Sequence, residues 1–310
     1  MANFTAQDVN ALRKSTGVGM MDCKNALVEA DGDMDKAAVI LREKGLATQA
    51  KKAGRVAAEG LVVAYVNADN TEGAIAEVNS ETDFVAKNPE FVSFANAVAK
   101  TAAEGKPADV DALYSAKISG GTGETVKEAL DTLFLKIREN LGVRRFECVN
   151  GILVSYIHGE GRIGVMVTIE SSLGSDNAAL LECGKNCALQ IAALNPTYLD
   201  RDAVPADVIE SEREIIKKQM AEDPKMANKP EQVIGKIAEG KLDKSLSETC
   251  LMEQEFVKDG NMNVKQYVES VAKSLGGDIK IKSFIRYERG EGVEKEASNL
   301  ADEVANMIKG

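Results

Sequence analysis

An internal repeat constrains the fold of this chain more than any other feature of its sequence. Residues 60–67 (GLVVAYVN) resemble residues 151–158 (GILVSYIH), and both runs have the apolar, β-branched character of a strand. A turn, a second apolar strand (residues 74–78 and 163–169) and a helix follow in both places. Because a pattern that occurs twice indicates two copies of one supersecondary unit, the sequence predicts two related α+β subdomains.

The helices that close the two copies carry their own signals. Asn88 and Pro89 are the N-cap and the first helical position expected for the first helix. The apolar residues at helical spacing in that helix are Phe91, Phe94, Ala95, Val98 and Ala99. Those in the second helix are Leu180, Gly184, Cys187, Ala188 and Ile191. Each helix therefore has an apolar face that can cover its strands.

Helical signals dominate the N-terminal part of the chain. Thr5 and Asp8 predict an acidic variant of the capping box at the start of one helix, and Gly17 ends it. A second helix is expected over about residues 21–30 and a third over residues 33–45, where Asp33 is a good N-cap. These signals predict a compact three-helix unit.

Charged helices interrupt the α+β pattern after the second copy of the repeat. Residues 201–248 combine many charges with apolar residues at helical spacing, and two proline-containing dipeptides, at Pro224 and Pro230, mark a turn. The sequence therefore predicts a helical hairpin that projects from the second subdomain. A projecting hairpin suits a partner protein or a second copy of this chain.

The last part of the chain returns to strand and helix patterns. Residues 279–287 alternate between apolar and charged side chains, although Phe284 breaks the polar face. A final short helix is expected to carry an apolar stripe of Leu300, Val304, Met307 and Ile308. That stripe must dock on the protein itself or on another molecule.

The predicted fold class is α+β, divided into several units. Residues 46–60 are rich in Ala and Lys and predict a polar, partly helical linker, which sets the first boundary near residue 56. The units are residues 1–56 (three-helix domain and linker), 57–149 (first core subdomain), 150–200 with 249–290 (second core subdomain), 201–248 (inserted helical hairpin) and 291–310 (C-terminal helical module).

Composition excludes several classes of function. The net charge of -11, the absence of Trp and an aromatic content of 5% argue against a nucleic-acid partner. No apolar run approaches the length of a membrane span and no targeting segment is recognisable, so a cytoplasmic protein is expected. The five cysteines are scattered and form no Cys-x-x-Cys pair, and there is one histidine. We therefore expect reduced thiols, no metal site and no cofactor.

No enzyme site of any specificity emerges from the residues. His158 lies at the end of a predicted strand before a hairpin turn, where a histidine is more often a surface residue than a general base. Glu81 and Asp83 have no enforced shared orientation, and solvated charges are the simpler interpretation. The glycine-rich residues 119–124 lack the Lys-Ser/Thr of a P-loop and predict a flexible loop. By elimination, the chain presents surfaces to another macromolecule.

Asp83 and Phe84 are the most informative surface candidates. They stand in the short connection between a strand and the helix that starts at Asn88, and that helix already has its own apolar face. An aromatic residue there is either tucked under the domain or held outward, and local reasoning alone favours the tucked arrangement. In the second copy of the repeat the corresponding residues are roughly Ser172 and Leu173, so the scaffold does not require an Asp-Phe pair.

Two long motifs resemble the signatures of the bacterial elongation factor Ts family. They are residues 12–27 (LRKSTGVGMMDCKNAL) and residues 77–86 (EVNSETDFVA), and further similarity covers essentially the whole chain. The resemblance implies a guanine-nucleotide exchange factor for elongation factor Tu in translation elongation. It also implies a ubiquitin-associated-like N-terminal domain, a two-subdomain core, an inserted hairpin that is used for dimerisation in some members, and a C-terminal helical module.

Residue matching to the family implies a set of partner contacts. The Asp-Phe pair, here Asp83 and Phe84, is expected to wedge between helices of the GTPase and to disturb its magnesium and phosphate site so that GDP leaves. The other matched positions are Arg13, Met20, Met21 and Lys24 in the N-terminal unit, Ile137, His158 and Val257 in the core, and Met307 near the C-terminus. Two adjacent methionines cannot both point inward on a helix, which favours exposure of at least one. Arg138 departs from the family pattern, in which glycine stands beside the Ile137 position.

Three functional hypotheses follow, in decreasing order of support. An exchange factor would bind GDP-bound and nucleotide-free elongation factor Tu without covalent chemistry. A structural adaptor would bind without affecting nucleotide release, and an enzyme would use His158 chemically. Because the net charge is negative, electrostatic steering toward a partner has to come from local basic residues such as Arg13, Lys24, Lys51 and Lys52.

Overall fold

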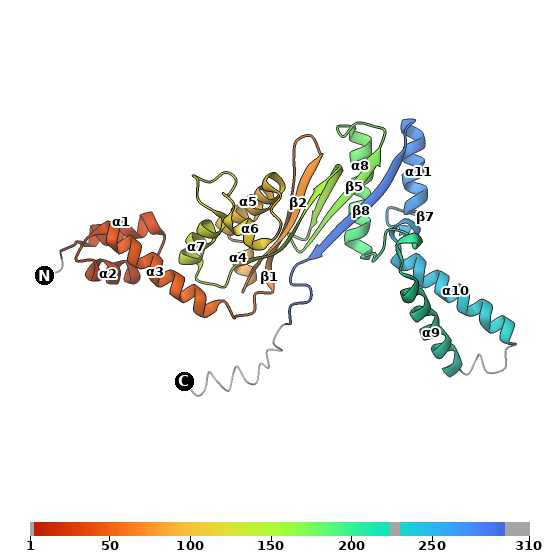
Figure 1. The fold of residues 1–310 in the computed structure, drawn as a ribbon, viewed down its shortest axis with the longest axis horizontal. Helices are drawn as coiled ribbons and strands as arrows, with labels where there is room; N and C mark the ends of the chain where they lie inside the picture. Colours follow the sequence, from red (N-terminus) through yellow and green to blue (C-terminus); the bar gives the residue numbers. More distant parts are fainter. Residues whose placement is uncertain (1–2, 224–229, 295–310) are drawn as a thin grey trace.

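The structure, a computed structural model, describes residues 3–223 and 230–294 (Figure 1). The N-terminal helices lie at one end of an elongated molecule, two β-sheets and their covering helices occupy the middle, and a helical hairpin projects at the other end (Figure 1). The strands of its sheets pair antiparallel and helices pack on them, so the predicted α+β class is confirmed.

Three helices form the N-terminal unit around a small core of their own. They are α1 (Ala6–Thr16), α2 (Met20–Glu29) and α3 (Met34–Lys52). The capping box between Thr5 and Asp8 is present, and Gly17 ends α1 with a φ of 71°, as the sequence predicts. Leu12, Cys23 and Leu27 are among the residues buried between the helices.

The prediction that the third helix ends at Gly45 is wrong, because α3 continues to Lys52. Gly45 has a packing role instead of a capping role. A Cβ atom added to it would lie 1.8 Å from Cδ2 of Leu135 on α7 (Val126–Ile137). The missing side chain therefore lets α3 pack closely against the core. The first part of the expected linker, residues 46–52, is therefore helical.

A testable consequence follows for this contact. Gly45→Ala should destabilise the protein because its methyl group overlaps Leu135, whereas in a Leu135→Ala background the same change should be neutral or stabilising, since alanine is the better helix former. The expected coupling between the two positions is about 1–3 kcal/mol in urea unfolding. Equal effects of Gly45→Ala in both backgrounds would contradict the contact.

The first copy of the repeat supplies two strands of a three-stranded antiparallel sheet. The strand order is β1-β2-β3, with β1 (Glu59–Val66), β2 (Glu72–Ser80) and β3 (Gly142–Asn150). The helices associated with this sheet are α4 (Asp83–Ala86), α5 (Pro89–Gly105), α6 (Val110–Ser115) and α7. Asn88 caps α5, and the predicted apolar face of α5 is buried against the sheet. β3 was not predicted from the sequence, because its apolar and charged residues show no clean alternation.

The second copy forms a sheet with the same antiparallel pattern. Its order is β4-β5-β8, with β4 (Ile152–His158), β5 (Ile163–Ser171) and β8 (Ile279–Glu288). The remaining elements of this region are α8 (Ala178–Leu194), α11 (Val264–Leu275), β6 (Glu255–Phe256) and β7 (Asp259–Asn263). The predicted apolar face of α8 packs on β5, where Val165, Val167 and Ile169 are buried.

A register shift in β8 explains why Phe284 breaks the polar face. Thr168 pairs with Ser283 but Ile169 pairs with Ile281, so Lys282 is an extra residue in β8. An extra residue reverses which face the following side chains occupy. As a result Phe284 packs with the second core, whereas Tyr287 packs between the two sheets in a cluster with Val62 and Ile75. The two sheets are joined there by the backbone hydrogen bond from the Val62 N–H to the Gly161 carbonyl, at 2.8 Å.

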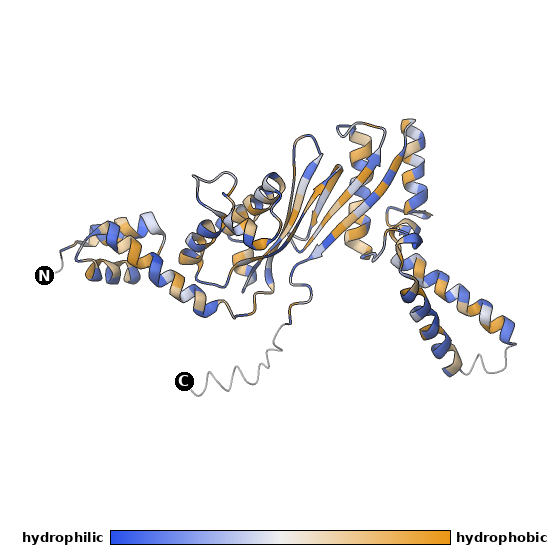
Figure 2. Cartoon of the chain, in the orientation of Figure 1, coloured by the Kyte–Doolittle hydropathy of each residue, from blue (hydrophilic) through white to orange (hydrophobic). Residues whose placement is uncertain are grey.

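The segment between α8 and β6 forms a helical hairpin. It contains α9 (Ala206–Glu222) and α10 (Glu231–Thr249), with short 3-10 turns at Arg201–Ala203 and Leu251–Glu253. Ile216, Met220, Ala238 and Leu242 are buried between its helices. Hydrophilic and hydrophobic residues occur along both helices (Figure 2). The expected final helix, with Leu300, Val304, Met307 and Ile308, falls outside the described residues.

Candidate partner-binding surface

The Asp83-Phe84 pair occupies a one-turn helix, α4, rather than an irregular connection. Val85 and Ala86 at the end of this turn are 7% and 5% exposed and pack into the first core. Phe84 is 82% exposed, the highest value among the large apolar residues that the structure describes. The local expectation that Phe84 is tucked under the domain is therefore wrong. An aromatic ring in water on an anchored turn is available for burial by another molecule.

His158 lies on a second element, next in the chain to residues that line a groove starting at α4, although neither His158 nor Phe84 lines that groove itself. The residue is exposed at the end of β4, and its Nδ1 atom lies 3.0 Å from the hydroxyl of Tyr156. The groove has a volume of about 680 Å³ and reaches from α4 to the turn between β4 and β5. Its lining includes Asp83, Lys87, Ile157, Glu160, Arg162 and Arg289. The structure thus places the Asp-Phe turn and the His158 hairpin on opposite sides of one depression.

The candidates of the N-terminal unit are accessible. Met20 and Met21 are 51% and 64% exposed at the start of α2, so neither belongs to the core of the three-helix unit. Arg13 and Lys24 are exposed as well. An ion pair between Asp22 and Arg138, at 2.9 Å, places the start of α2 beside the end of α7, where Ile137 packs partly into the first core.

The departure at Arg138 has a structural reason. Arg138 follows α7 with a φ of 64°, a left-handed conformation that glycine adopts at lower cost. Its side chain binds Asp22, and its carbonyl accepts a hydrogen bond from the Lys52 ammonium group. Arg138 therefore adopts a backbone conformation that is less favourable for arginine than for glycine, and its side chain gains a contact with the N-terminal unit.

Two of the candidate residues are not brought to this region. Val257 is 49% exposed in the turn between β6 and β7, and its N–H donates to Gln190 of α8. In Figure 1 that turn lies on the side of the second sheet from which the hairpin projects, away from α4. Met307 falls outside the described residues.

The contacts around the titratable candidates do not form a catalytic arrangement. Glu81 accepts a hydrogen bond from the Asn140 N–H at 2.6 Å, whereas Asp83 pairs with Lys87 at 3.6 Å, so the two carboxylates have different partners. The loop at residues 119–124 is filled by the Glu124 carboxylate, which accepts from the Thr122 N–H at 2.8 Å and would repel a phosphate.

Four of the five cysteines are buried, and Cys148 is half-buried. All five cysteines are free, and the hydrogen bond with Cys183 together with burial raises the pKa of the Cys187 thiol.

In residues 3–223 and 230–294, no group of three or more His, Cys, Asp or Glu side chains is placed to hold a metal ion. Within the same ranges, no helix has both the length and the apolar composition needed to cross a membrane.

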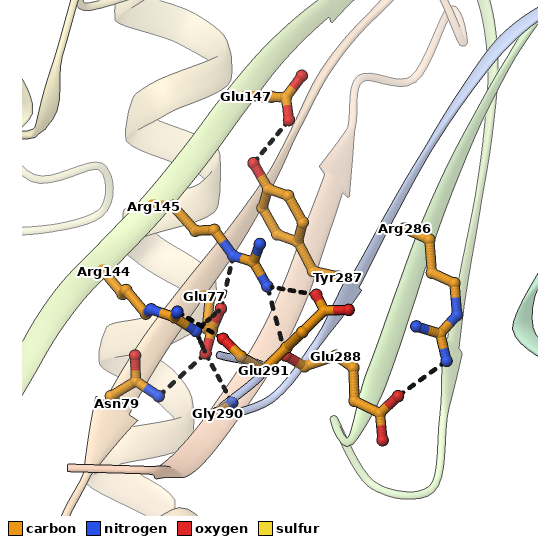
Figure 3. A network of polar contacts seen from close by, with 10 residues as sticks. All are labelled: Glu77, Asn79, Arg144, Arg145, Glu147, Arg286, Tyr287, Glu288, Gly290 and Glu291. Carbon is orange, nitrogen blue, oxygen red and sulfur yellow. Dashed lines mark hydrogen bonds and ion pairs between the residues drawn. The ribbon is translucent and has the colours of Figure 1, made fainter. Parts of the chain in front are cut away.

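A buried carboxylate that the sequence analysis missed joins the two sheets behind this surface. Glu77 on β2 is fully buried and accepts hydrogen bonds from Arg145 Nε at 2.7 Å, Arg144 Nη1 at 3.1 Å and the Gly290 N–H at 2.8 Å (Figure 3). Arg145 also contacts Glu291 at 3.1 Å. Because Gly290 follows β8 of the second sheet, the Glu77 network fastens that sheet to the first.

The network also changes the ionisation of its central group. Burial alone would raise the pKa of Glu77, but the hydrogen bonds from the Gly290 N–H, Asn79, Arg145 and Arg144 together lower that pKa below its ordinary value. Glu77 is therefore a charged, fully paired group.

Comparisons with known proteins agree along the length of the chain. The family model described as "Elongation factor TS" matches residues 81–291. A protein named "Elongation factor Ts" from Clostridioides difficile (strain 630) is 48% identical over 311 residues, which cover 100% of both chains. Proteins of the same name from Clostridium novyi (strain NT) and Clostridium tetani (strain Massachusetts / E88) are 47% and 45% identical, over 98% and 99% of this chain and 98% and 100% of their own.

Proposed function

Because the chain belongs to the elongation factor Ts family, a family of translation elongation factors, we propose that it binds elongation factor Tu and promotes the release of GDP. Phe84, 82% exposed on a turn anchored by buried neighbours, is the observation that carries the proposal. Asp83 and Phe84 would enter between helices of the GTPase near its magnesium and phosphate site. Burying Phe84 supplies binding energy, while Asp83 orients the contact.

Such a factor works by differential binding and needs no covalent chemistry. It must hold the nucleotide-free GTPase more tightly than the GDP-bound form. Linkage then requires that the bound factor weaken GDP binding by the same ratio. A rigid wedge meets this requirement, because its contacts are complete only in the partner conformation from which GDP has been displaced.

The proposed interface extends beyond the wedge. Exposure supports roles for Arg13, Met20, Met21 and Lys24 of the N-terminal unit and for His158 and Val257 of the second subdomain. Ile137, which is partly buried, would contribute only its accessible edge. Met307 is proposed from the resemblance alone. The partner would then contact several separate units of this chain.

We also propose a division of labour among the units. Residues 1–56 would be a ubiquitin-associated-like recognition domain, and residues 57–149 and 150–200 with 249–290 would be the two core subdomains. Residues 201–248 would offer a surface for a second copy of this chain, and residues 291–310 would contact the GTPase. The protein would act in the cytoplasm, where translation takes place.

A nucleotide-release assay tests the proposed function. Elongation factor Tu loaded with a fluorescent GDP analogue should lose it faster when the full chain is added together with excess unlabelled GDP. Binding without faster release would favour the structural adaptor and refute exchange. A chemical turnover that requires His158 would instead support the enzyme hypothesis.

A further inference from the structure

Glu139, which is distant in the sequence, forms hydrogen bonds with the start of the turn that carries Phe84. The Glu139 carboxylate accepts a hydrogen bond from the Thr82 backbone N–H at 3.0 Å. The Thr82 hydroxyl also donates to it, lying 2.8 Å from Oε1 and 3.1 Å from Oε2. Thr82 is the N-cap residue of α4, so Glu139 holds the residue from which the turn begins.

This arrangement replaces the usual capping contact. An N-cap threonine normally accepts a hydrogen bond from a backbone N–H of the first helical turn. In α4 that side-chain cap is absent, and the Thr82 hydroxyl is directed to Glu139 instead. A helix of one turn is not stable by itself, because helix nucleation is unfavourable. The orientation of α4 therefore depends on contacts from outside the turn.

The group that holds Thr82 is itself well anchored. The N–H of the preceding residue, Arg138, donates to the carbonyl of Phe134 at 2.8 Å, and Phe134 is fully buried. The following residue, Asn140, donates its N–H to Glu81 and its side-chain amide to the Arg55 carbonyl at 2.8 Å. Glu139 thus projects from a backbone that is fixed on both sides. The α4 turn is anchored at its start by Glu139 and at its end by the burial of its own Val85 and Ala86.

We propose that Glu139 is a positioning residue for nucleotide exchange: by holding Thr82 it fixes α4, and with it the direction in which Phe84 projects. The inference rests on the proposed function and adds a residue that acts through Thr82. A wedge that is ordered before binding loses less conformational freedom when it inserts. Releasing the turn should therefore weaken the step that Phe84 drives and spare the rest of the interface.

A double-mutant cycle on GDP release from elongation factor Tu tests this role. Glu139→Ala should lower the release rate at saturating exchange factor about tenfold, the factor that one charge-assisted hydrogen bond supports. The half-saturating concentration should change much less. In the Phe84→Ala background the same substitution should have no further effect, because two residues that act through one contact are not additive.

Two further variants separate positioning from charge. Glu139→Gln keeps an acceptor oxygen for Thr82 and should retain most of the release rate. Glu104→Ala removes an exposed carboxylate at the far end of α5, which pairs with Lys100 at 3.7 Å, and should change nothing. The positioning role is refuted if Glu139→Ala slows release by the same factor in the unmodified protein and in the Phe84→Ala background. It is also refuted if Glu139→Ala only raises the half-saturating concentration.

Hydrogen exchange of the free protein tests the holding contact without the partner. A peptide that covers residues 81–87 should exchange faster in Glu139→Ala than in the unmodified protein or in Glu104→Ala. Unchanged exchange in that peptide would overturn the proposal even if elongation factor Tu did not respond to the chain. Conversely, faster exchange together with no stimulation of GDP release by the unmodified protein would refute the proposed function and leave the contact established.

Discussion

Replacing Phe84 by alanine is expected to reduce the stimulation of GDP release from elongation factor Tu by about 10- to 150-fold. Full burial of a phenylalanine side chain is worth about 1.5–3 kcal/mol, and each 1.4 kcal/mol corresponds to a factor of about ten. Because Phe84 is 82% exposed in the free protein, nearly all of this energy would be gained in the complex. The rate of fluorescent GDP release at a fixed, subsaturating concentration of the variant measures the loss.

The same substitution should leave the protein itself intact. Removing an exposed side chain usually changes the free energy of unfolding by no more than about 0.5 kcal/mol, which urea denaturation resolves. Val39→Ala is a matched control, because Val39 is 56% exposed on α3 and belongs to none of the proposed contacts. It should release GDP like the unmodified protein. Normal release by Phe84→Ala, or an equal defect in Val39→Ala, would remove the wedge from the mechanism.

Features of the fold that depend on local signals were predicted correctly from the sequence. The capping box at Thr5 and the N-cap at Asn88 are determined by residues a few positions apart. The two successive strands of each repeat copy and the apolar faces of α5 and α8 follow from short periodic patterns. In each case the physical cause lies within one element or one turn.

Features that depend on distant residues were missed. Gly45 looks like a helix end until Leu135 is seen to fill the space beside it. β3 pairs with β2 across more than sixty intervening residues, and two of its charged side chains, Arg144 and Arg145, bind the buried Glu77. The reversal of faces in β8 depends on which residue of β5 pairs with Ser283. None of these partners can be read from the segment concerned.

The candidate partner-binding surface was likewise predicted where local signals suffice and missed where distant residues decide. Local patterns identified Asp83 and Phe84 as unusual but favoured burial, and only the family signature pointed to exposure. The structure places Phe84 outward because Val85 and Ala86 already occupy the adjoining core positions. Glu139 carried no local signal, since a glutamate outside any motif is most often a solvated surface residue. Glu77 lies in a predicted apolar strand and in a family signature, but neither pattern indicated the arginines that bind it.

The second large effect is expected at Glu77, through stability. Glu77→Ala should lower the free energy of unfolding by about 3 kcal/mol, the lower end for breaking a buried ion pair, because it leaves Arg144 and Arg145, whose side chains are each 31% exposed, without their shared carboxylate. The N–H of Gly290 would lose its acceptor as well. Glu72→Ala is the matched control on the same strand: its exposed carboxylate pairs with Lys106 at 2.6 Å, and its loss should cost no more than about 1 kcal/mol. Urea unfolding at neutral pH compares the two.

The effect of Glu77 should depend on pH with a definite sign. The folded-state pKa of Glu77 lies below its ordinary value of 4.5, so the charged network stabilises the protein fully above the unfolded-state pKa. That contribution is lost as the pH falls through the lower, folded-state pKa, where the buried carboxylate takes up a proton. The stability gap between the unmodified protein and Glu77→Ala should therefore be constant from about pH 6 to 8 and should narrow below about pH 4.5. A gap that stays constant down to acid unfolding would mean that packing, and not the charge on Glu77, joins the two sheets.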